Sequence, residues 1–290
     1  MMTNYKVPYV LFAVALTIIV AAPLASARQH KAKLPKSLRL YVFDCGVLHF
    51  DNADSYSLKK EEVAATDMSV PCFLVAHPKG TMIWDTGIIP DISFKPGGGL
   101  VKEGIATSDT PLLPQLAAAG YLPADITYLA LSHNHGDHVA NSNAFAGATW
   151  LVRQSERDLM FSEPPPARMA RANFNALKES KTIIIGQDDS YDVFHDGTVI
   201  IKSAPGHSPG HQVLFLKLAK TGPVVLSGDL YHYPEERKLN RFPIREFDKD
   251  QTVRSRAAIE AFLKESGAQL WIEHDINANA KLGKAPKYYE

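Results

Sequence analysis

The sequence has only two cysteines and no net charge, because 31 Lys and Arg balance 31 Asp and Glu among its 290 residues. Two cysteines exclude a disulfide-dense scaffold and a cysteine-based zinc finger or iron–sulfur site, so any metal site must be built from histidines and carboxylates. The balanced charge provides no basic surface for nucleic acid or for an anionic membrane. Since 46% of the residues are hydrophobic, a disordered polyampholyte is also excluded.

The amino-terminal apolar run is too short for a typical membrane-spanning helix, which needs about 20 residues. It extends from Tyr9 to Ala22, with Lys6 before it, Pro23 after it and the small residues Ala25-Ser26-Ala27 beyond. This layout is typical of a secretory signal peptide, with an uncleaved anchor as the alternative. We expect residues 1–27 to be removed and residues 28–290 to form one exported domain, periplasmic or secreted and free of the membrane.

Patterns typical of strands and helices alternate along the rest of the chain. The turn Pro78-Lys79-Gly80 predicts a hairpin, and a second hairpin in the later half favours a mixed sheet layered with helices. Two segments, 88–109 and 162–178, are predicted as long surface loops, either binding loops or excursions without a role. Strands are predicted at 38–48, 70–77, 81–85, 126–132, 149–153, 198–203, 212–218, 224–227 and finally 269–273, and helices at 111–119, from 154 and at 251–265.

Three histidines and an aspartate follow the strand predicted at 126–132, within six residues: His133, His135, Asp137 and His138. Imidazole and carboxylate are ligands of zinc and similar divalent ions, and such a cluster is electrostatically unfavourable without a cation. Alternation in an extended segment sends His133 and His135 to one side, while the following turn presents Asp137 and His138 to a neighbouring position. This arrangement suits two adjacent metal ions better than one.

Further ligand-type residues follow three later strands. His207 lies on a loop rich in proline and glycine, Asp229 follows the strand at 224–227, and His274 follows the strand at 269–273. Each alone would be an ordinary polar strand end. Because open α/β folds bind ligands at one edge of the sheet, we expect these residues to converge with the first cluster in a single site.

The order and spacing of these residues resemble the metallo-β-lactamase superfamily, whose pattern is matched by His133-x-His135-x-Asp137-His138, then His207, Asp229 and His274. Within that superfamily the chain is most similar to the N-acyl homoserine lactone lactonases, through Trp84-Asp85-Thr86-Gly87, the segment 205–212 and Glu273-His274-Asp275-Ile276. The resemblance covers about Leu38 to Tyr289. It implies an α/β fold, an αββα sandwich of two mixed β-sheets flanked by helices.

The resemblance also implies a cofactor and a reaction. The cofactor is two zinc ions, although iron, cobalt or manganese would fit the same ligands. The reaction is quorum quenching, in which a hydroxide bridging the metals opens the lactone ring of an N-acyl homoserine lactone while Asp229 passes on the proton. One ion would be held by His133, His135 and His207, the other by Asp137, His138 and His274, with Asp229 bridging the two.

One position departs from the lactonase pattern. The family's substrate-orienting tyrosine, three residues after the bridging aspartate, is replaced here by His232. The orienting role then falls to His232 itself, to Tyr231 or to Tyr233. With the metal-binding residues Asp137 and Asp229, His232 and Tyr231 complete the expected catalytic set.

Four other residues have expected roles outside the metal-binding and catalytic sets. Asp85 is expected either to orient metal ligands by hydrogen bonds or to cap a turn. His211 is expected to be structural. Cys45 and Cys72, on successive predicted strands, either form a disulfide in an oxidising compartment or stay as two buried thiols.

The nearest alternative function is another hydrolase on the same scaffold, acting on an aryl ester, a thioester or a β-lactam. An acidic bridge at Asp229 argues against a zinc β-lactamase, and export argues against a glutathione thioesterase. A non-catalytic zinc protein would need every coordination position of the metal to be filled by the protein, whereas seven ligands shared by two ions leave room for water.

Six apolar residues of the two predicted loops and their borders either line an acyl pocket or belong to the core: Ile88, Ile89, Phe94, Met160, Phe161 and Met169.

Overall fold

The fold is that of Ala32–Glu290, which form one unit separate from Met1–Lys31. A computed structural model describes residues 1–4, 32–166, 169–186 and 190–290. All but the first four residues of the predicted signal peptide lie outside the described residues. Within the described residues, no helix combines the length and apolarity that a membrane crossing requires.

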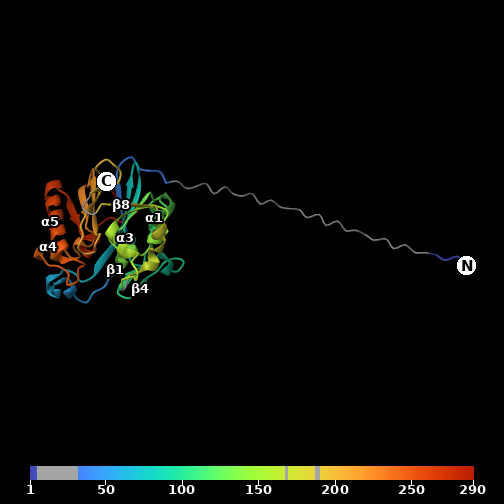
Figure 1. Cartoon of the computed structure of the whole chain (residues 1–290), viewed down its shortest axis with the longest axis horizontal. Helices are drawn as coiled ribbons and strands as arrows, with labels where there is room; N and C mark the ends of the chain where they lie inside the picture. Colours follow the sequence, from blue (N-terminus) through green and yellow to red (C-terminus); the bar gives the residue numbers. More distant parts are fainter. Residues whose placement is uncertain (5–31, 167–168, 187–189) are drawn as a thin grey trace. The chain divides into compact units, whose positions relative to one another are not determined.

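Two mixed β-sheets lie at the centre of the unit (Figure 1). The first has the order β4 (Val101–Glu103), β5 (Ala106–Ser108), β1 (Arg39–Leu48), β2 (Met68–His77), β3 (Gly80–Trp84), β6 (Tyr128–Ala130), β7 (Thr149–Arg153) and β8 (Thr182–Ile185), with β14 (Tyr288–Tyr289) also paired to β1. The second has the order β13 (Gln269–Trp271), β12 (Gly222–Leu226), β11 (Gln212–Leu218), β10 (Val199–Ser203) and β9 (Tyr191–Asp192). Each sheet contains antiparallel and parallel pairs, as predicted.

Helices cover the outer faces of the two sheets. Figure 1 shows α4 and α5 on one side and α1 and α3 on the other. The α-helices are α1 (Leu112–Ala118), α2 (Gly136–Val139), α3 (Gln154–Met160), α4 (Pro234–Leu239), α5 (Lys249–Ser266) and α6 (Ile276–Asn279). Short 3-10 helices are η1 (Asp54–Tyr56), η2 (Lys60–Glu62), η3 (Asp91–Ser93), η4 (Pro123–Asp125), η5 (Ser142–Phe145), η6 (Arg171–Asn173), η7 (Asn175–Glu179) and η8 (Gly228–Leu230).

Three apolar layers hold the sandwich together, and alternate side chains of β1 belong to two of them. Leu40 and Val42 point into the layer between the sheets, whereas Tyr41 and Phe43 point into the layer beneath α1. This is the period of two expected for a strand buried on both faces. The third layer packs α5 against the second sheet. The predicted αββα sandwich is therefore confirmed.

Most predicted elements are present, and three expectations need correction. The segment 88–109 is not only a loop, because it contains the strands β4 and β5. The strand β13 is not the last one, because β14 returns to pair with β1. The strands β8 and β9 lie where no strand was predicted.

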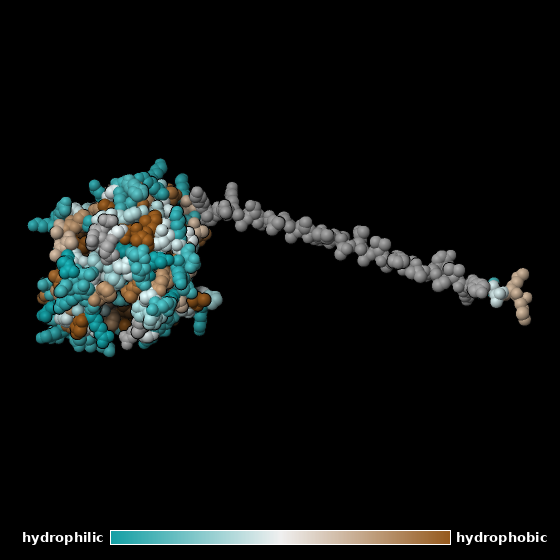
Figure 2. Space-filling model, viewed as in Figure 1, coloured by the Kyte–Doolittle hydropathy of each residue, from teal (hydrophilic) through white to brown (hydrophobic). Residues whose placement is uncertain are grey.

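Figure 2 shows that the face in view is mostly hydrophilic, with hydrophobic residues in separate patches, as expected for a polar domain surface.

The two cysteines are paired. Cys45 on β1 and Cys72 on β2 form a disulfide, with their Cα atoms 5.9 Å apart. Of the two alternatives open from the sequence, the structure therefore has the disulfide. The disulfide lies in the apolar layer beneath α1. It is next to Gly87, in the turn that follows β3, because a Cβ atom added to Gly87 would lie 2.8 Å from the Cys45 Cβ.

Candidate metal centre

The predicted ligands all follow strands that end at one edge of the sandwich. The cluster His133–His138 follows β6, while His207 follows β10. Asp229 lies in η8 directly after β12, and His274 lies three residues after β13. The strands β12 and β13 are parallel neighbours, and β10 runs in the same direction because both β10 and β12 are antiparallel to β11. The topology thus brings together residues that lie up to 141 positions apart.

The Asp229 carboxylate lies between two sets of imidazoles. Its Oδ1 atom is 3.1 Å from His138 Nε2 and 3.0 Å from His274 Nε2. Its Oδ2 atom is 3.4 Å from His133 Nε2 and 3.2 Å from His207 Nε2. One carboxylate therefore presents a separate oxygen to each set, which is the geometry that a bridging ligand requires.

The donor atoms fall into two groups of four, each spanning no more than 4.8 Å and each suited to a metal ion. The groups share Asp229. Burial alone would raise the pKa of Asp229, but the surrounding imidazoles outweigh burial and hold it well below its ordinary value, so the carboxylate is anionic. The groups are His133, His135, His207 and Asp229, and Asp137, His138, Asp229 and His274.

Three buried atoms in this centre lie close to one another but have no hydrogen-bond partner within the described chain. They are the Nε2 atoms of His133 and His138 and the Oδ1 atom of Asp229. Burying such atoms unpaired is costly, and a cation held between them would remove the cost. The donor set therefore fits a divalent metal of the zinc type, as the sequence indicated.

Hydrogen bonds from the other ring nitrogen fix the orientation of the metal-facing imidazoles. His138 Nδ1 is 2.8 Å from Asp85 Oδ2, and His274 Nδ1 is 2.8 Å from the Ser69 carbonyl oxygen. His207 Nδ1 lies 3.3 Å from Glu246 Oε2, within ion-pair distance but without hydrogen-bond geometry. Such partners leave Nε2 free for a metal and hold the ring in place. Glu246 was not foreseen, because nothing in its local sequence relates it to His207.

Asp85 orients the His138 imidazole, which was one of the two roles expected for it. Its Oδ2 atom pairs with His138, and its Oδ1 atom accepts a hydrogen bond of 2.6 Å from the Ser132 backbone N–H. The residue is fully buried at a backbone φ of 55°. Asp85 therefore joins the end of β3 to the start of the histidine cluster.

A buried carboxylate that the sequence did not reveal, Glu156 on α3, connects the loop of His133 and His135 with the loop of His207. Its Oε1 atom accepts a hydrogen bond of 2.8 Å from the Asn134 backbone N–H, between His133 and His135. Its Oε2 atom accepts hydrogen bonds of 2.7 Å from Ser208 Oγ and 2.8 Å from the Gly210 N–H, beside His207. Burial raises the pKa of Glu156, and these hydrogen bonds oppose that rise.

His211 is structural, as expected. Its Nδ1 atom is 2.9 Å from the Ala204 carbonyl oxygen, and its Nε2 atom accepts a hydrogen bond of 2.9 Å from the Asp229 N–H. Burial, followed by the effect of nearby His207, lowers the pKa of His211 to about 3, so the ring is a neutral acceptor. His211 thus fixes the backbone of Asp229.

The residues after Asp229 correct part of the expected catalytic set. His232 lies in the site, with Nε2 3.2 Å from Asp229 Oδ2. Tyr231 does not, because its hydroxyl donates a hydrogen bond of 3.1 Å to Glu260 and its ring packs in the apolar layer under α5. Tyr233 is also directed elsewhere, donating a hydrogen bond of 2.7 Å to the Thr66 carbonyl oxygen.

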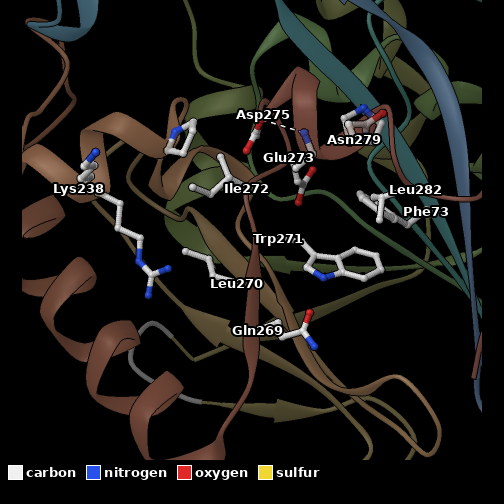
Figure 3. A pocket seen from close by; sticks show the side chains of 14 residues that line it. Phe73, Lys238, Gln269, Leu270, Trp271, Ile272, Glu273, Asp275, Asn279 and Leu282 are labelled. Carbon is white, nitrogen blue, oxygen red and sulfur yellow. Dashed lines mark hydrogen bonds between the residues drawn. The ribbon is translucent and has the colours of Figure 1, made fainter. Parts of the chain in front are cut away.

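A cavity of about 1220 Å³ opens over the histidines and aspartates. A second cavity, of about 510 Å³, adjoins it and shares His135, Gly136, His207 and Arg245 with the first. A third hollow, of about 590 Å³, has no histidine among its lining residues; Figure 3 shows Leu270, Trp271 and Leu282 along it. The chemistry-bearing residues therefore face the first two cavities.

Only two of the six apolar residues considered for an acyl pocket line the cavities beside the metal centre. They are Ile88 in the larger cavity and Met169 in the smaller one. The other four belong to or pack against the core beneath α1: Ile89, Phe94, Met160 and Phe161. The segments 88–109 and 162–178 nevertheless both reach a cavity, so each contributes to a binding surface.

The αββα sandwich carries clusters of histidine and aspartate at its strand ends that could hold metal ions, and the site rather than the fold indicates the class of protein. The model of the metallo-beta-lactamase superfamily matches residues 65–267 of this chain. The chain belongs to the metallo-beta-lactamase superfamily.

Comparison with individual proteins narrows this assignment. The chain is 31% identical over 264 residues to the N-acyl homoserine lactonase AttM of Rhizobium radiobacter, covering 87% of this chain and 98% of the relative. It is similar to a solved quorum-quenching N-acyl homoserine lactone lactonase, with a TM-score of 0.72, 24% identity and coverage of 88% and 100%. It is also similar to an N-acyl homoserine lactone hydrolase solved with N-hexanoyl-L-homoserine at its catalytic metal centre, with a TM-score of 0.69, 24% identity and coverage of 89% and 99%. The predicted family and fold are confirmed.

Proposed function

We propose that this chain is a dinuclear zinc hydrolase that opens the lactone ring of N-acyl homoserine lactones. The observation that carries the proposal is the Asp229 carboxylate, which offers Oδ1 to His138 and His274 and Oδ2 to His133 and His207. A large cavity opens over this pair of donor groups. The similarity to named lactonases over most of the chain supports the choice of substrate class.

The chain's own residues would bind the metals and handle the proton. When bound, the ions would polarise the lactone carbonyl and lower the pKa of a coordinated water. Asp137 belongs to one donor group, and Asp229 is shared by both. The Asp229 carboxylate, at the floor of the cavity, is placed to accept the proton of the attacking water and return it to the ring oxygen that leaves.

The larger cavity also suits the acyl part of such a substrate. Apolar side chains make up much of its wall, and they come from β1 and the residues just after it, from β2, and from the segments near 88, 105 and 244. An acyl chain would bury apolar surface against them, which contributes about 25 cal/mol per Å². The apolar lining residues are Leu48, Phe50, Met68, Ile88, Ile105, Pro243 and Ile244.

We also propose that the protein is exported, with residues 1–27 as its signal peptide. The charged start, the short apolar run and the small residues at Ala25-Ser26-Ala27 support this. The disulfide between Cys45 and Cys72 adds support, because structural disulfides persist in oxidising compartments and are rare in the cytosol.

A substrate comparison tests the proposed activity. The purified protein without residues 1–27, loaded with zinc, is assayed on short-chain and long-chain N-acyl homoserine lactones, a cephalosporin, an aryl ester and a thioester. We expect the highest kcat/KM on one of the lactones and loss of that activity after treatment with a chelator. A higher kcat/KM on the cephalosporin, the aryl ester or the thioester would replace the lactonase with another hydrolase of the same fold.

A further inference from the structure

The larger cavity has one aromatic hydroxyl whose role is not explained by the fold. Tyr56, the last residue of η1, lines this cavity together with His232 and Asp229. In the described part of the chain, the Tyr56 hydroxyl makes no hydrogen bond, whereas the hydroxyls of Tyr231 and Tyr233 are both bonded to protein groups. Tyrosine hydroxyls that are buried for structural reasons usually have a protein partner. The half-buried Tyr56 hydroxyl has none among the described residues, so it is available to a ligand in the cavity.

The ring of Tyr56 is held next to the metal centre. Its centroid lies 4.6 Å from that of His232 and 5.2 Å from that of Tyr233. His232 in turn places Nε2 3.2 Å from Asp229 Oδ2. The ring therefore stands one side chain away from the carboxylate shared by the two donor groups.

The backbone around Tyr56 is also fixed. The Ser57 hydroxyl donates a hydrogen bond of 2.7 Å to the Phe242 carbonyl oxygen, and the Ile244 N–H donates one of 2.8 Å to the Ser55 carbonyl oxygen. These two bonds tie η1 to the segment that follows α4, which lines the same cavity. A side chain held in this way is oriented before the substrate arrives, which lowers the entropic cost of binding.

His232 is poorly suited to donate a hydrogen bond to a substrate. Its Nε2 atom faces Asp229, and its Nδ1 atom is 3.4 Å from Glu236 Oε2. Both ring nitrogens are thus occupied by carboxylates of the protein.

We propose that the Tyr56 hydroxyl donates a hydrogen bond to a carbonyl oxygen of the bound substrate and takes the orienting role that neither Tyr231, Tyr233 nor His232 fills. This inference rests on the proposed function for the identity of the substrate. Burial, together with the Asp229 and Asp137 carboxylates, raises the pKa of Tyr56, so the hydroxyl keeps its proton at neutral pH. A phenol in this setting serves as a donor and not as a base.

The test compares Tyr56→Phe with Tyr233→Phe, each as the zinc-loaded protein on a short-chain N-acyl homoserine lactone. Tyr56→Phe keeps the ring packing, so we expect kcat/KM to fall about tenfold or more while zinc content and Tm stay at wild-type values. Tyr233→Phe removes a hydroxyl bonded to the Thr66 carbonyl and is expected to keep wild-type kcat/KM.

Wild-type kcat/KM in Tyr56→Phe would overturn the inference. An equal loss of kcat/KM in the two variants would overturn it too, and so would a loss of kcat/KM that lower zinc content explains. If the wild type instead prefers an ester or thioester of the comparison above, the lactonase proposal fails. The two variants are then compared on that preferred substrate, where the same tenfold fall supports the role of Tyr56 and wild-type activity overturns it.

Discussion

Replacing Asp229 with alanine is expected to lower kcat/KM for lactone hydrolysis by about 10³-fold or more. The reason is that Asp229 is the one residue common to both four-residue donor groups within the described chain. Its loss leaves each group with a missing oxygen and leaves buried imidazoles facing one another without an anion between them. Bound zinc should fall below two ions per chain, as measured by elemental analysis of the purified variant.

Asp250→Ala is the matched control for this variant, because it removes an exposed carboxylate in the first turn of α5, outside both donor groups. It is expected to keep wild-type activity and zinc content. Asp229→Asn preserves the shape of the side chain and guards against a simple folding defect, yet its amide cannot offer two anionic oxygens. Hydrolysis at the wild-type rate by either Asp229 variant would contradict the proposed role of the carboxylate.

The largest loss of stability from a single methyl group is expected at Gly206, immediately before His207. Its φ is +136°, and an added Cβ would lie within 2.6 Å of the Thr252 Cα and even closer to the Thr252 backbone nitrogen. The start of α5 packs here, with Ser255 Oγ donating a hydrogen bond of 2.6 Å to the Pro205 carbonyl oxygen. Gly206→Ala must therefore displace either α5 or the loop that carries His207.

We expect Gly206→Ala to cost more than about 4 kcal/mol in the free energy of unfolding, which lowers Tm by about 10 °C. Zinc content should fall as well, because His207 moves with the loop. Gly147→Ala serves as the control, since an added Cβ there meets nothing within 4 Å and its φ is not positive. Equal thermal denaturation curves for the two variants would show that the contact between α5 and this loop carries little stability.

Local patterns predicted the fold well where an element is buried and bounded by turn residues. β11 has the predicted bounds Gln212–Leu218, and α5 contains the predicted helix and ends at Gly267 with φ +67°. The strands β4 and β5 were harder to predict because each has three residues, and β5 is held by pairing with the distant β1. Their stability comes from contacts that the local sequence does not contain.

The residues of the candidate metal centre were predictable because motif spacing and strand ends carry a local signal. The residues that support them carry none. Glu156 and Glu246 lie on α3 and in the segment before α5, and only the tertiary fold brings them to the loops of His135 and His207. Their detection from sequence would require knowledge of contacts across 22 and 39 positions along the chain.

The placement of Tyr231 away from the candidate metal centre has a geometric cause. The backbone is extended at Tyr231 and Tyr233, with φ and ψ of −142° and 135° and of −116° and 144°. Successive side chains of an extended segment point to opposite sides, so His232 facing Asp229 requires both tyrosines to face away. Tyr56, from a segment to which no element was assigned, lies beside His232 instead.

We propose that two metal ions support lactone hydrolysis. The seven residues that would bind them are His133, His135, Asp137, His138, His207, Asp229 and His274. The most direct measurement removes metal from the protein with a chelator and restores zinc stepwise, recording bound zinc and hydrolysis of an N-acyl homoserine lactone at each step. We expect that the metal-free protein is inactive and that the rate reaches its maximum at two zinc ions per chain. Full activity without metal, or a maximum at one ion per chain, would contradict it.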